Sequence, residues 1–517
     1  MQGRKEIQPK MLYQVHLDDL VEEDNFYRKL NKSLDLSFLY KETAKYYGNE
    51  GQEGIDPVVF FKTCLIGYLN NIDSDRRLIQ YCSNCLDTRL YLKYDIDEKL
   101  PWHSTISRTR QLYGEEVFLS LFRKVLSLCV QKGMVRGKRQ AVDSAFIKAN
   151  ASLESIIEKE ILEDVSVYAN ELNQGSEFQI NTPQLIKEQS NKEKENQGSE
   201  NIENKNNPGD IVKGKFSETH FSTTDPDARL SVKPGKVRQL NYYGQLAVDD
   251  ANHVITGAMA DFADKRDSQC LPQILQQTIN NLNQHAIQIE QVCADTNYSS
   301  GSALRFLEEN KIEGYIPNAG QFKPTREGFI YNLELDQWEC QRGNKAILKF
   351  KGILKSDKDY EKKTYRSSQK DCKGCQFLNT CLSKTPFKRI DETLDKPYYD
   401  RMHEKMQTLY AKRIMRIRSK TVEPVLGTLI NFMNMKRVNT RGIEQANKHV
   451  LMAALSYNLK KYLRFNVKNN VNLAIAKTKK SNESLASLKT MISDSIKAIL
   501  RIPNFSNKLI LVKTVIA

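Results

Sequence analysis

Three acidic residues that lie far apart in the chain could together hold metal ions: Asp143, Asp295 and Glu423. They stand in the segments RQAVDSAFIKANAS, IEQVCADTNYSSG and SKTVEPVLGTLI. Carboxylate oxygens are ligands that Mg2+ and Mn2+ prefer, and two such ions can activate one oxygen and stabilise another in phosphodiester chemistry. Because the chain has 63 acidic residues, only their surroundings can single these three out.

The surroundings of Asp143 and Asp295 are strand-like. Residues 138–152 predict a strand on which Asp143 shares a face with Ala141 and Ile147. An acid on an apolar strand face is costly unless it has a partner or a ligand. Asp295 ends the strand IEQVCAD, at the carboxyl end where α/β sheets place their sites. Taken alone, each residue is also explained by a turn or a helix cap.

Glu423 has a competitor for the third position. It precedes Pro424, and this pair predicts the first turn of a helix, where the helix dipole favours an acid with no catalytic duty. The competitor is Glu444, which an exposed pair with Lys448, four residues later, explains. Glu423 is preferred because it has apolar neighbours on its own helix.

The segments between these acids predict an α/β domain. In residues 236–318, VRQLNYYGQLAVDD and HVITGAMADF predict a hairpin, and LPQILQQTINNL predicts a helix before the strand of Asp295. Strands that alternate with helices are typical of an α/β sheet. Residues 153–222 are largely polar and charged, which predicts a disordered excursion from the folded domain. From about residue 400 the pattern is helical again.

The first 135 residues are predicted to be mostly helical. Asp56 and Pro57 open one helix with an apolar stripe, and Ser74 caps the next. The segment LPWHSTISRTRQLYG predicts a further Ser/Thr-capped helix that carries basic residues. Short helices of this kind suit helix-turn-helix DNA binding. An ordinary helical domain with a solvated basic face explains them equally well.

The charge of the chain favours a polyanionic partner. Lys and Arg number 78 against 63 acidic residues, a net charge of +15 and a pI near 9.1. Nucleic acid is the simplest such partner, and solubility is the alternative explanation. No apolar run reaches the length of a membrane span, and MQGRKEIQPK lacks a signal-peptide core. We expect a reducing cytoplasm.

The cysteines form one conspicuous group. Cys372, Cys375 and Cys381 stand in DCKGCQFLNTC, and Cys340 lies upstream in WECQRG. The first pair has the spacing of zinc ligands, and four thiolates would make a closed structural site. Reduced, partly buried thiols are the alternative. A second CxxC, at residues 82 and 85, lies in a helical pattern and is interpreted as core.

The combination of these segments resembles a known family. DPVVFFKTCLIGYLNNIDSDRRLIQY with LPWHSTISRTR, VDSAFIKANAS, AVDDANHVITG, ADTNYSSG and TVEPVLGTLINFMNMKRVNTRG together resemble the insertion-sequence DDE transposases of the family conventionally numbered eleven-eighty-two. The resembling segments run from about residue 35 to 465. Several ordered blocks over most of a chain are more specific than a lone motif.

The resemblance implies a fold and a division into domains. The fold would be α/β, a ribonuclease-H-like mixed-sheet catalytic core with an insertion, preceded by an all-helical N-terminal domain. The expected parts are 1–135, helical and DNA-binding; 136–318, the first part of the core; 319–400, the cysteine-bearing insertion; 401–465, the helical end of the core with the Glu; and 466–517, a basic tail.

The resemblance also implies an activity. Asp143, Asp295 and Glu423 would hold two Mg2+ or Mn2+ ions, and the protein would cleave and join double-stranded DNA at element terminal inverted repeats and at a target, as a dimer or larger assembly. The expected DNA contacts are His103, Arg108, Arg110, Arg418, Lys436, Arg437 and Arg441. Two alternatives remain open: a transposase-derived DNA-binding protein that no longer cuts, and a metal-dependent nuclease that does not join ends.

Overall fold

The computed structural model describes most of the chain outside three longer segments. The described residues are 16–48, 50, 54–158, 219–231, 237–319, 322, 324–332, 334–343, 345–355, 361–382 and 385–465. Most of the excursion expected at 153–222, and the tail at 466–517, therefore lie outside the described residues. The chain divides into two units, Met1–Tyr462 and Leu463–Ala517, and the elements below belong to the first.

The N-terminal region is helical, as the sequence predicts. Its helices are α1 (Leu17–Leu20), α2 (Phe26–Ser33), α3 (Phe38–Thr43), the 3-10 helix η1 (Ala44–Tyr46), α4 (Pro57–Leu69), α5 (Asp75–Asn84), α6 (Leu86–Leu92), α7 (His103–Leu112) and α8 (Glu115–Gln131). Asp56 caps α4 by accepting from the backbone N–H groups of Val58 and Val59. However, every residue of α4 from Phe60 to Leu69 is buried. The buried surface of this helix is therefore wider than the one-sided apolar stripe that the sequence predicts.

The helix caps of this region test the sequence patterns directly. Ser74 caps α5 by accepting from the backbone N–H of Arg77, which confirms that prediction. The Ser/Thr cap expected for α7 is wrong, because the residue before this helix is Trp102 and it makes no side-chain cap. The first turn of α7 is instead closed by the backbone, where the N–H of Thr105 donates to the carbonyl of Trp102 at 2.9 Å.

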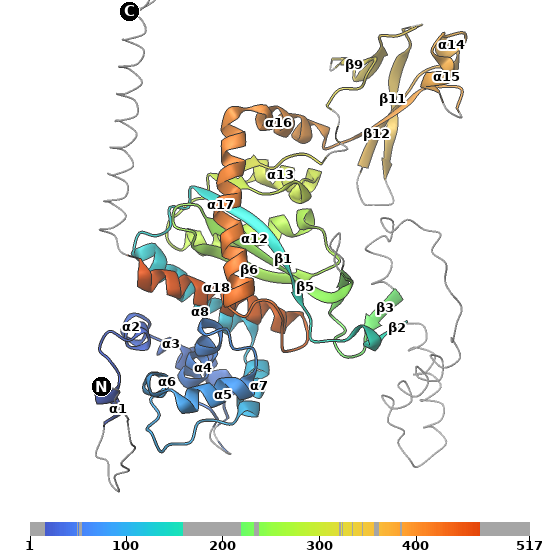
Figure 1. Cartoon of the computed structure of the whole chain (residues 1–517). Coiled ribbons are helices and arrows are strands. Elements are labelled where there is room, and N and C mark those ends of the chain that lie inside the picture. Colours follow the sequence, from blue (N-terminus) through green and yellow to red (C-terminus); the bar gives the residue numbers. More distant parts are fainter. Residues whose placement is uncertain are drawn as a thin grey trace, which may run out of the picture. The chain divides into compact units, whose positions relative to one another are not determined.

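A six-stranded mixed sheet forms the centre of the fold (Figure 1). Its strands are β1 (Arg139–Lys148), β4 (Arg229–Ser231), β5 (Gln239–Asp249), β6 (Ile255–Phe262), β7 (Gln291–Cys293) and β8 (Glu313–Tyr315). β5 runs antiparallel to β1, β4 and β6, whereas β7 is parallel to both β1 and β8. β5 and β6 form the predicted hairpin. The mixed α/β class expected from the sequence is confirmed.

Helices pack on this sheet from distant parts of the chain. α12 (Asp267–Asn283) lies against β5 and β6, and α13 (Gly301–Glu309) follows the 3-10 helix η3 (Thr296–Tyr298). The long helix α17 (Leu409–Phe432) lies against β1, β5, β7 and β8. α18 (Ile443–Arg464) is buried along most of its length. Among the described residues, no helix is long and apolar enough to cross a membrane.

The helix of Glu423 begins earlier than the sequence suggests. Pro424 indicated a first helical turn, but α17 starts at Leu409 and carries Pro424 in its interior. A proline inside a helix removes one backbone hydrogen bond, and Pro424 lies on the exposed side of the helix. The burial of Val422 and Val425 against the sheet outweighs this loss. The interpretation of Glu423 as an acid at a helix start is therefore wrong.

A second sheet occupies the segment that seemed irregular. Its five strands, all antiparallel to their neighbours, are β9 (Phe329–Asn332), β10 (Gln337–Cys340), β11 (Ile347–Lys355), β12 (Glu361–Arg366) and β13 (Arg389–Thr393). The helices α14 (Gln369–Cys372), α15 (Leu378–Cys381) and α16 (Lys396–Gln407) follow or interrupt it, and β2 (Ile156–Glu158) pairs with β3 (His220–Ser222) elsewhere. These strands were not recognised in the sequence because their solvent-facing residues include both lysines and apolar residues, which obscures the alternation of polar and apolar positions.

Candidate active site

Asp143 lies in the middle of β1, between β5 and β7. Its Oδ1 accepts a hydrogen bond of 2.8 Å from the backbone N–H of Ser144, and its Oδ2 lies 3.0 Å from Nη1 of Arg418. Only 18% of the side chain is exposed. Burial raises the pKa of Asp143, and the negative charge of Asp295 raises it further, against the lowering effect of Arg418.

Asp295 lies two residues beyond the end of the neighbouring strand β7, which the sequence predicts to extend to Asp295. β7 runs parallel to β1 with Cys293 opposite Ala141, so two further residues along each chain bring Asp295 beside Asp143. The Asp295 side chain caps η3 by accepting a hydrogen bond of 3.0 Å from the backbone N–H of Asn297. Burial raises the pKa of Asp295, and the charge of Asp267 adds to this effect.

Glu423 approaches the same place from α17. Its Oε1 lies 3.4 Å from Nη2 of Arg418, and 57% of its side chain is exposed. Arg418 therefore forms ion pairs with both Asp143 and Glu423, while its charge also lowers the pKa of Asp295. Two acids from distant segments thus pair with one guanidinium, whereas Asp295 is influenced by its charge without a hydrogen bond or ion pair to it among the described residues. Arg418 itself, expected as a DNA contact, is only 11% exposed.

The chemistry of this donor set fits a divalent metal. Carboxylate oxygens are hard ligands, and two of the three acids carry pKa values raised mainly by burial and also by a neighbouring acid, an effect that a bound cation would oppose. The carboxylates nevertheless stand apart around Arg418. In the part of the chain that the structure describes, no group of three or more His, Cys, Asp or Glu side chains is close enough to hold a metal ion. Metal binding at these acids would require the Arg418 side chain to move away from Asp143 and Glu423.

A buried hydrogen-bond network behind the acids was not found from the sequence. Asp267, the first residue of α12, accepts 2.6 Å hydrogen bonds from the hydroxyls of Ser144 and Tyr243. It also accepts from the side-chain amide of Gln245, and that side chain accepts from Tyr298 at 2.7 Å. The network ties the strand of Asp143 to the turn that follows Asp295. Its members come from four separate segments, so spacing gave no signal.

Lys436 and Arg437 lie beside the end of the strand that carries Asp143. The backbone N–H of Lys148, the last residue of β1, donates to the carbonyl of Lys436 at 3.1 Å. Arg437 donates to the side chain of Asn150 at 2.9 Å. Both basic side chains are exposed, as is that of Arg441. The structure therefore brings this part of the expected DNA surface to the end of β1, on the strand that also carries Asp143.

The remaining expected DNA contacts lie on α7. Arg108 is exposed and His103 is partly exposed, whereas Arg110 turns inward. The guanidinium of Arg110 makes two hydrogen bonds of 2.7 and 2.9 Å to the carboxylate of Asp75. This buried pair holds α7 to α5, so Arg110 is not free to contact a phosphate in this structure. The sequence did not indicate this arrangement, because Arg110 pairs with Asp75 on a different helix.

The Glu444 alternative is explained as the sequence suggested, with one difference. Glu444 forms the expected ion pair with Lys448 at 2.8 Å. Lys448 is almost completely buried, however, and its Nζ also donates to the backbone carbonyl of Arg110. Glu444 therefore has a structural partner, and among the described residues no hydrogen bond or ion pair joins it to Asp143 or Asp295.

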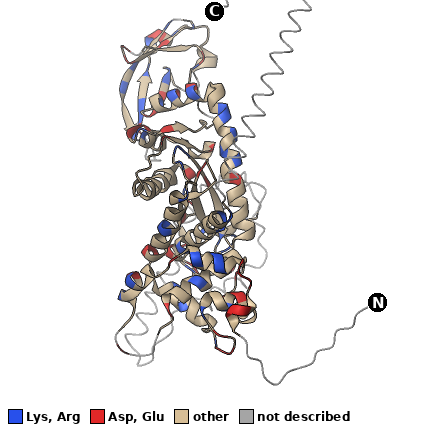
Figure 2. Ribbon diagram, turned by 90° about the vertical axis from the view of Figure 1, so that its left-hand side faces the viewer, with Lys and Arg blue, Asp and Glu red and all other residues tan. Residues whose placement is uncertain are grey.

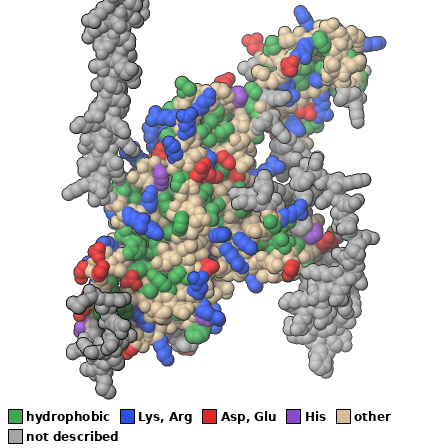
Figure 3. Space-filling model, viewed as in Figure 1, with side chains coloured by type: hydrophobic (Ala, Val, Ile, Leu, Met, Phe, Trp, Pro, Cys, Tyr) green, Lys and Arg blue, Asp and Glu red, His purple; other side chains and the backbone are tan. Residues whose placement is uncertain are grey.

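Positive charge is spread widely over the described surface. Lys412, Arg413, Arg416 and Lys420 are exposed along α17, and Figure 2 shows basic residues along this long helix. Figure 3 shows Lys and Arg side chains over much of one face, with acidic side chains between them. The charge thus extends from the acidic site over several elements, which suits a long polyanion better than a small ligand.

Comparison with known protein families agrees with this geometry. Residues 15–112 match the family described as Transposase domain (DUF772), and residues 339–463 match the family described as Transposase DDE domain. The second match contains Glu423, whereas Asp143 and Asp295 lie before it. No curated protein matches the chain.

The chain is therefore similar to transposases in two separate segments, one to a DUF772 domain and one to a DDE domain. A DDE domain implies a ribonuclease-H-like core, which agrees with the mixed sheet, and a metal-dependent enzyme that cleaves or transfers DNA strands. It also implies divalent metal ions and DNA as a partner.

Proposed function

We propose that this protein is a transposase that binds the ends of an insertion sequence and uses Asp143, Asp295 and Glu423 as its catalytic acids. The observation that carries this proposal is that Arg418 forms ion pairs with both Asp143 and Glu423. Asp295 lies two residues beyond the end of the neighbouring strand β7, and its charge raises the pKa of Asp143. Membership of the family numbered eleven-eighty-two is part of the proposal.

The three acids would hold two Mg2+ or Mn2+ ions. When bound, such ions supply activation of a water or a DNA 3′-hydroxyl and stabilisation of the leaving oxygen. The chain itself orients the acids: the backbone N–H groups of Ser144 and Asn297 each hold one carboxylate oxygen. The pairing of β1 with β7 ends two residues before each aspartate and brings both segments to the same edge of the site.

Exposed basic residues would hold the DNA backbone beside these acids. We propose Arg108, Lys436, Arg437 and Arg441 as contacts, because they combine exposure with the charge that phosphates require, and the partly exposed His103 as a hydrogen-bond donor to phosphate. Arg418 would move to DNA phosphate once a metal ion replaces it at the acids. Arg110 is left out because Asp75 already engages it.

The domains have corresponding roles in this proposal. Residues 1–135 would bind element ends, residues 136–318 and 401–465 would build the catalytic core, and residues 319–400 would be an insertion in it. Transposition must hold two element ends together, so a dimer or larger assembly on DNA follows. The protein would act in the bacterial cytoplasm, on the nucleoid.

A joining assay separates this proposal from its alternatives. Purified protein is incubated with Mg2+ or Mn2+, DNA carrying the flanks of its own gene, and a supercoiled target plasmid, beside an Asp295→Asn variant. We expect wild type alone to cut at the flanks and to insert the cut ends into the plasmid. Cutting without insertion would favour a nuclease. Specific binding without cutting, with both metals, would favour a DNA-binding protein that has lost catalysis.

A further inference from the structure

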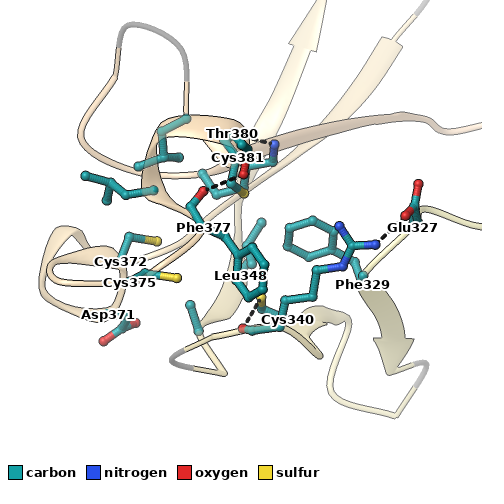
Figure 4. Close-up of a pocket in the computed structure, with 16 residues that line it drawn as sticks. Glu327, Phe329, Cys340, Leu348, Asp371, Cys372, Cys375, Phe377, Thr380 and Cys381 are labelled. Atoms are coloured by element: carbon teal, nitrogen blue, oxygen red, sulfur yellow. Dashed lines mark hydrogen bonds and ion pairs between the residues drawn. The ribbon is translucent and has the colours of Figure 1, made fainter.

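Four cysteines from separate elements line one pocket of the second sheet (Figure 4). Cys340 ends β10, Cys372 ends α14, Cys375 follows in the next turn, and Cys381 ends α15. The pocket has a volume of about 200 Å3, and each cysteine is a partly buried free thiol. Figure 4 shows the sulfur atoms of Cys372 and Cys375 directed toward its interior.

Tight turns hold two of these cysteines in place. Gly374, between Cys372 and Cys375, has a φ of 73°, and the backbone N–H of Cys375 donates to the carbonyl of Cys372 at 3.3 Å. Glycine adopts this left-handed conformation without the penalty that a side chain would impose. The turn therefore presents both thiols of the CxxC segment from one short loop.

A second tight turn follows Cys340 and packs on the first. Gly343 has a φ of 54°, and a Cβ atom added to it would collide with the Sγ of Cys375. The Sγ of Cys340 lies 2.9 Å from the carbonyl oxygen of Arg342 in the same turn. The two cysteine-bearing turns are therefore in direct contact, although 32 residues separate Cys340 from Cys372.

The second sheet has only a small buried apolar core to stabilise the region around these cysteines. Its buried core consists of Trp338, Leu348, Tyr365 and Ile390, while Phe350 and Ile353 remain exposed. α14 and α15 have four residues each, too few for helices that are stable alone. Small folds with so little buried apolar surface are usually stabilised by a disulfide or a structural metal ion.

We propose that Cys340, Cys372, Cys375 and Cys381 bind one structural Zn2+ ion. Each thiol loses its proton on binding, so four sulfur–zinc bonds form, up to four protons are released to solvent, and no electron is transferred. The resulting site carries a charge of −2, which Arg342 and Lys388, both lining the pocket, partly offset. The described thiols are not yet close enough for a completed site, so zinc would draw them inward.

Zinc content of the full chain is the direct test. The protein is purified without chelator, dialysed, and analysed for metal by mass spectrometry beside a Cys372→Ser/Cys375→Ser variant. We expect about one zinc ion per wild-type chain and none in the variant. A Cys82→Ala/Cys85→Ala variant is the matched control, because it removes the other CxxC from α5, outside the pocket, and should keep its zinc.

Further measurements keep the test decisive if the serine variant folds poorly. Co2+ added to metal-free wild type should produce a thiolate-to-cobalt absorption band, and removal of zinc should speed hydrogen exchange in β11 and β12 but not in β1. An Asp295→Asn variant should retain its zinc, which separates this site from the catalytic acids. Wild-type protein with no zinc and no cobalt band, or with a Cys372–Cys375 disulfide in its place, would overturn the proposal.

Discussion

The guanidinium of Arg418 on α17 lies 3.0 Å from the carboxylate of Asp143 on β1, and so joins segments 275 residues apart. Its other terminal nitrogen lies 3.4 Å from Glu423. Its Nε is buried and has no hydrogen-bond partner among the described residues. The chain therefore supplies its own cation to acids that we propose as metal ligands.

Removal of this cation should destabilise the protein in the absence of metal. We expect Arg418→Ala to lower the free energy of unfolding by about 1–3 kcal/mol, because Asp143 loses a charged hydrogen bond in a mostly buried place. Denaturant unfolding in chelator measures the loss. Arg416→Ala, an exposed neighbour on the same helix, is the control and should change little. An unchanged Arg418→Ala stability would mean that the pair contributes nothing.

The raised pKa of Asp143 gives a prediction for pH. The folded state holds a proton on Asp143 more tightly than the unfolded state does, because burial raises the pKa above its ordinary value of 3.8. Stability therefore falls as pH rises through the window between these two pKa values. In chelator, we expect the stability of wild type relative to Asp143→Asn to fall as pH is raised above the ordinary pKa of 3.8.

The opposite pH trend would contradict this account. A relative stability that rises with pH would mean that the folded pKa of Asp143 is lowered, as in a carboxylate whose pairing with Arg418 outweighs its burial. The burial of Asp143 is the largest cause of its pKa shift, which is why we expect the falling trend. Glu423→Gln is a matched control, since that side chain is mostly exposed.

The network of Asp267 should position the catalytic acids. Ser144→Ala removes a 2.6 Å hydrogen bond to Asp267 and leaves Asp143 in place. We expect DNA cleavage to fall about 10- to 100-fold, with a higher metal concentration needed for half-maximal rate. A metal titration of cleavage measures both. A loss of stability with an unchanged metal requirement would make the network structural only.

The sequence predicted the strands of the acids but not how the acids are surrounded. Strand alternation located β1 and β7, because a buried sheet imposes its period on the chain. The start of α17 was predicted too late in the chain, because Pro424 is typical of a first helical turn. The burial of Val422 and Val425, which keeps the helix continuous through Pro424, is not visible in the sequence. Arg110, Arg418 and Asp267 were misjudged or missed because their partners lie far away in sequence. Long-range pairing leaves no periodic signal.

The second sheet shows the same limit. Its strands carry many lysines and several exposed apolar residues, such as Phe350 and Ile353, so no clear alternation is visible. The cysteines were nevertheless recognisable, because the spacing of a CxxC segment depends only on local chain geometry. That Cys340 lines the same pocket as the other three depends on the antiparallel pairing of β10 with β11.

DNA affinity should depend on the basic residues beside β1. We expect Arg437→Ala to weaken binding to every DNA sequence similarly, and to lower the slope of log affinity against log salt by about 0.9, the effect of one phosphate contact. Binding over a salt series measures this slope. Arg401→Ala, whose guanidinium pairs with Glu308, is the control. An unchanged slope for Arg437→Ala would exclude it as a phosphate contact.

The most direct measurement is cleavage of gene-flank DNA in Mn2+ by wild type, Glu423→Gln and Glu444→Gln, after each protein is shown to be folded and to bind that DNA. Glu423 shares Arg418 with Asp143, whereas Glu444 pairs with Lys448. We predict cleavage by wild type and Glu444→Gln and none by Glu423→Gln. Cleavage by Glu423→Gln at the wild-type rate would contradict the assignment of the catalytic acids.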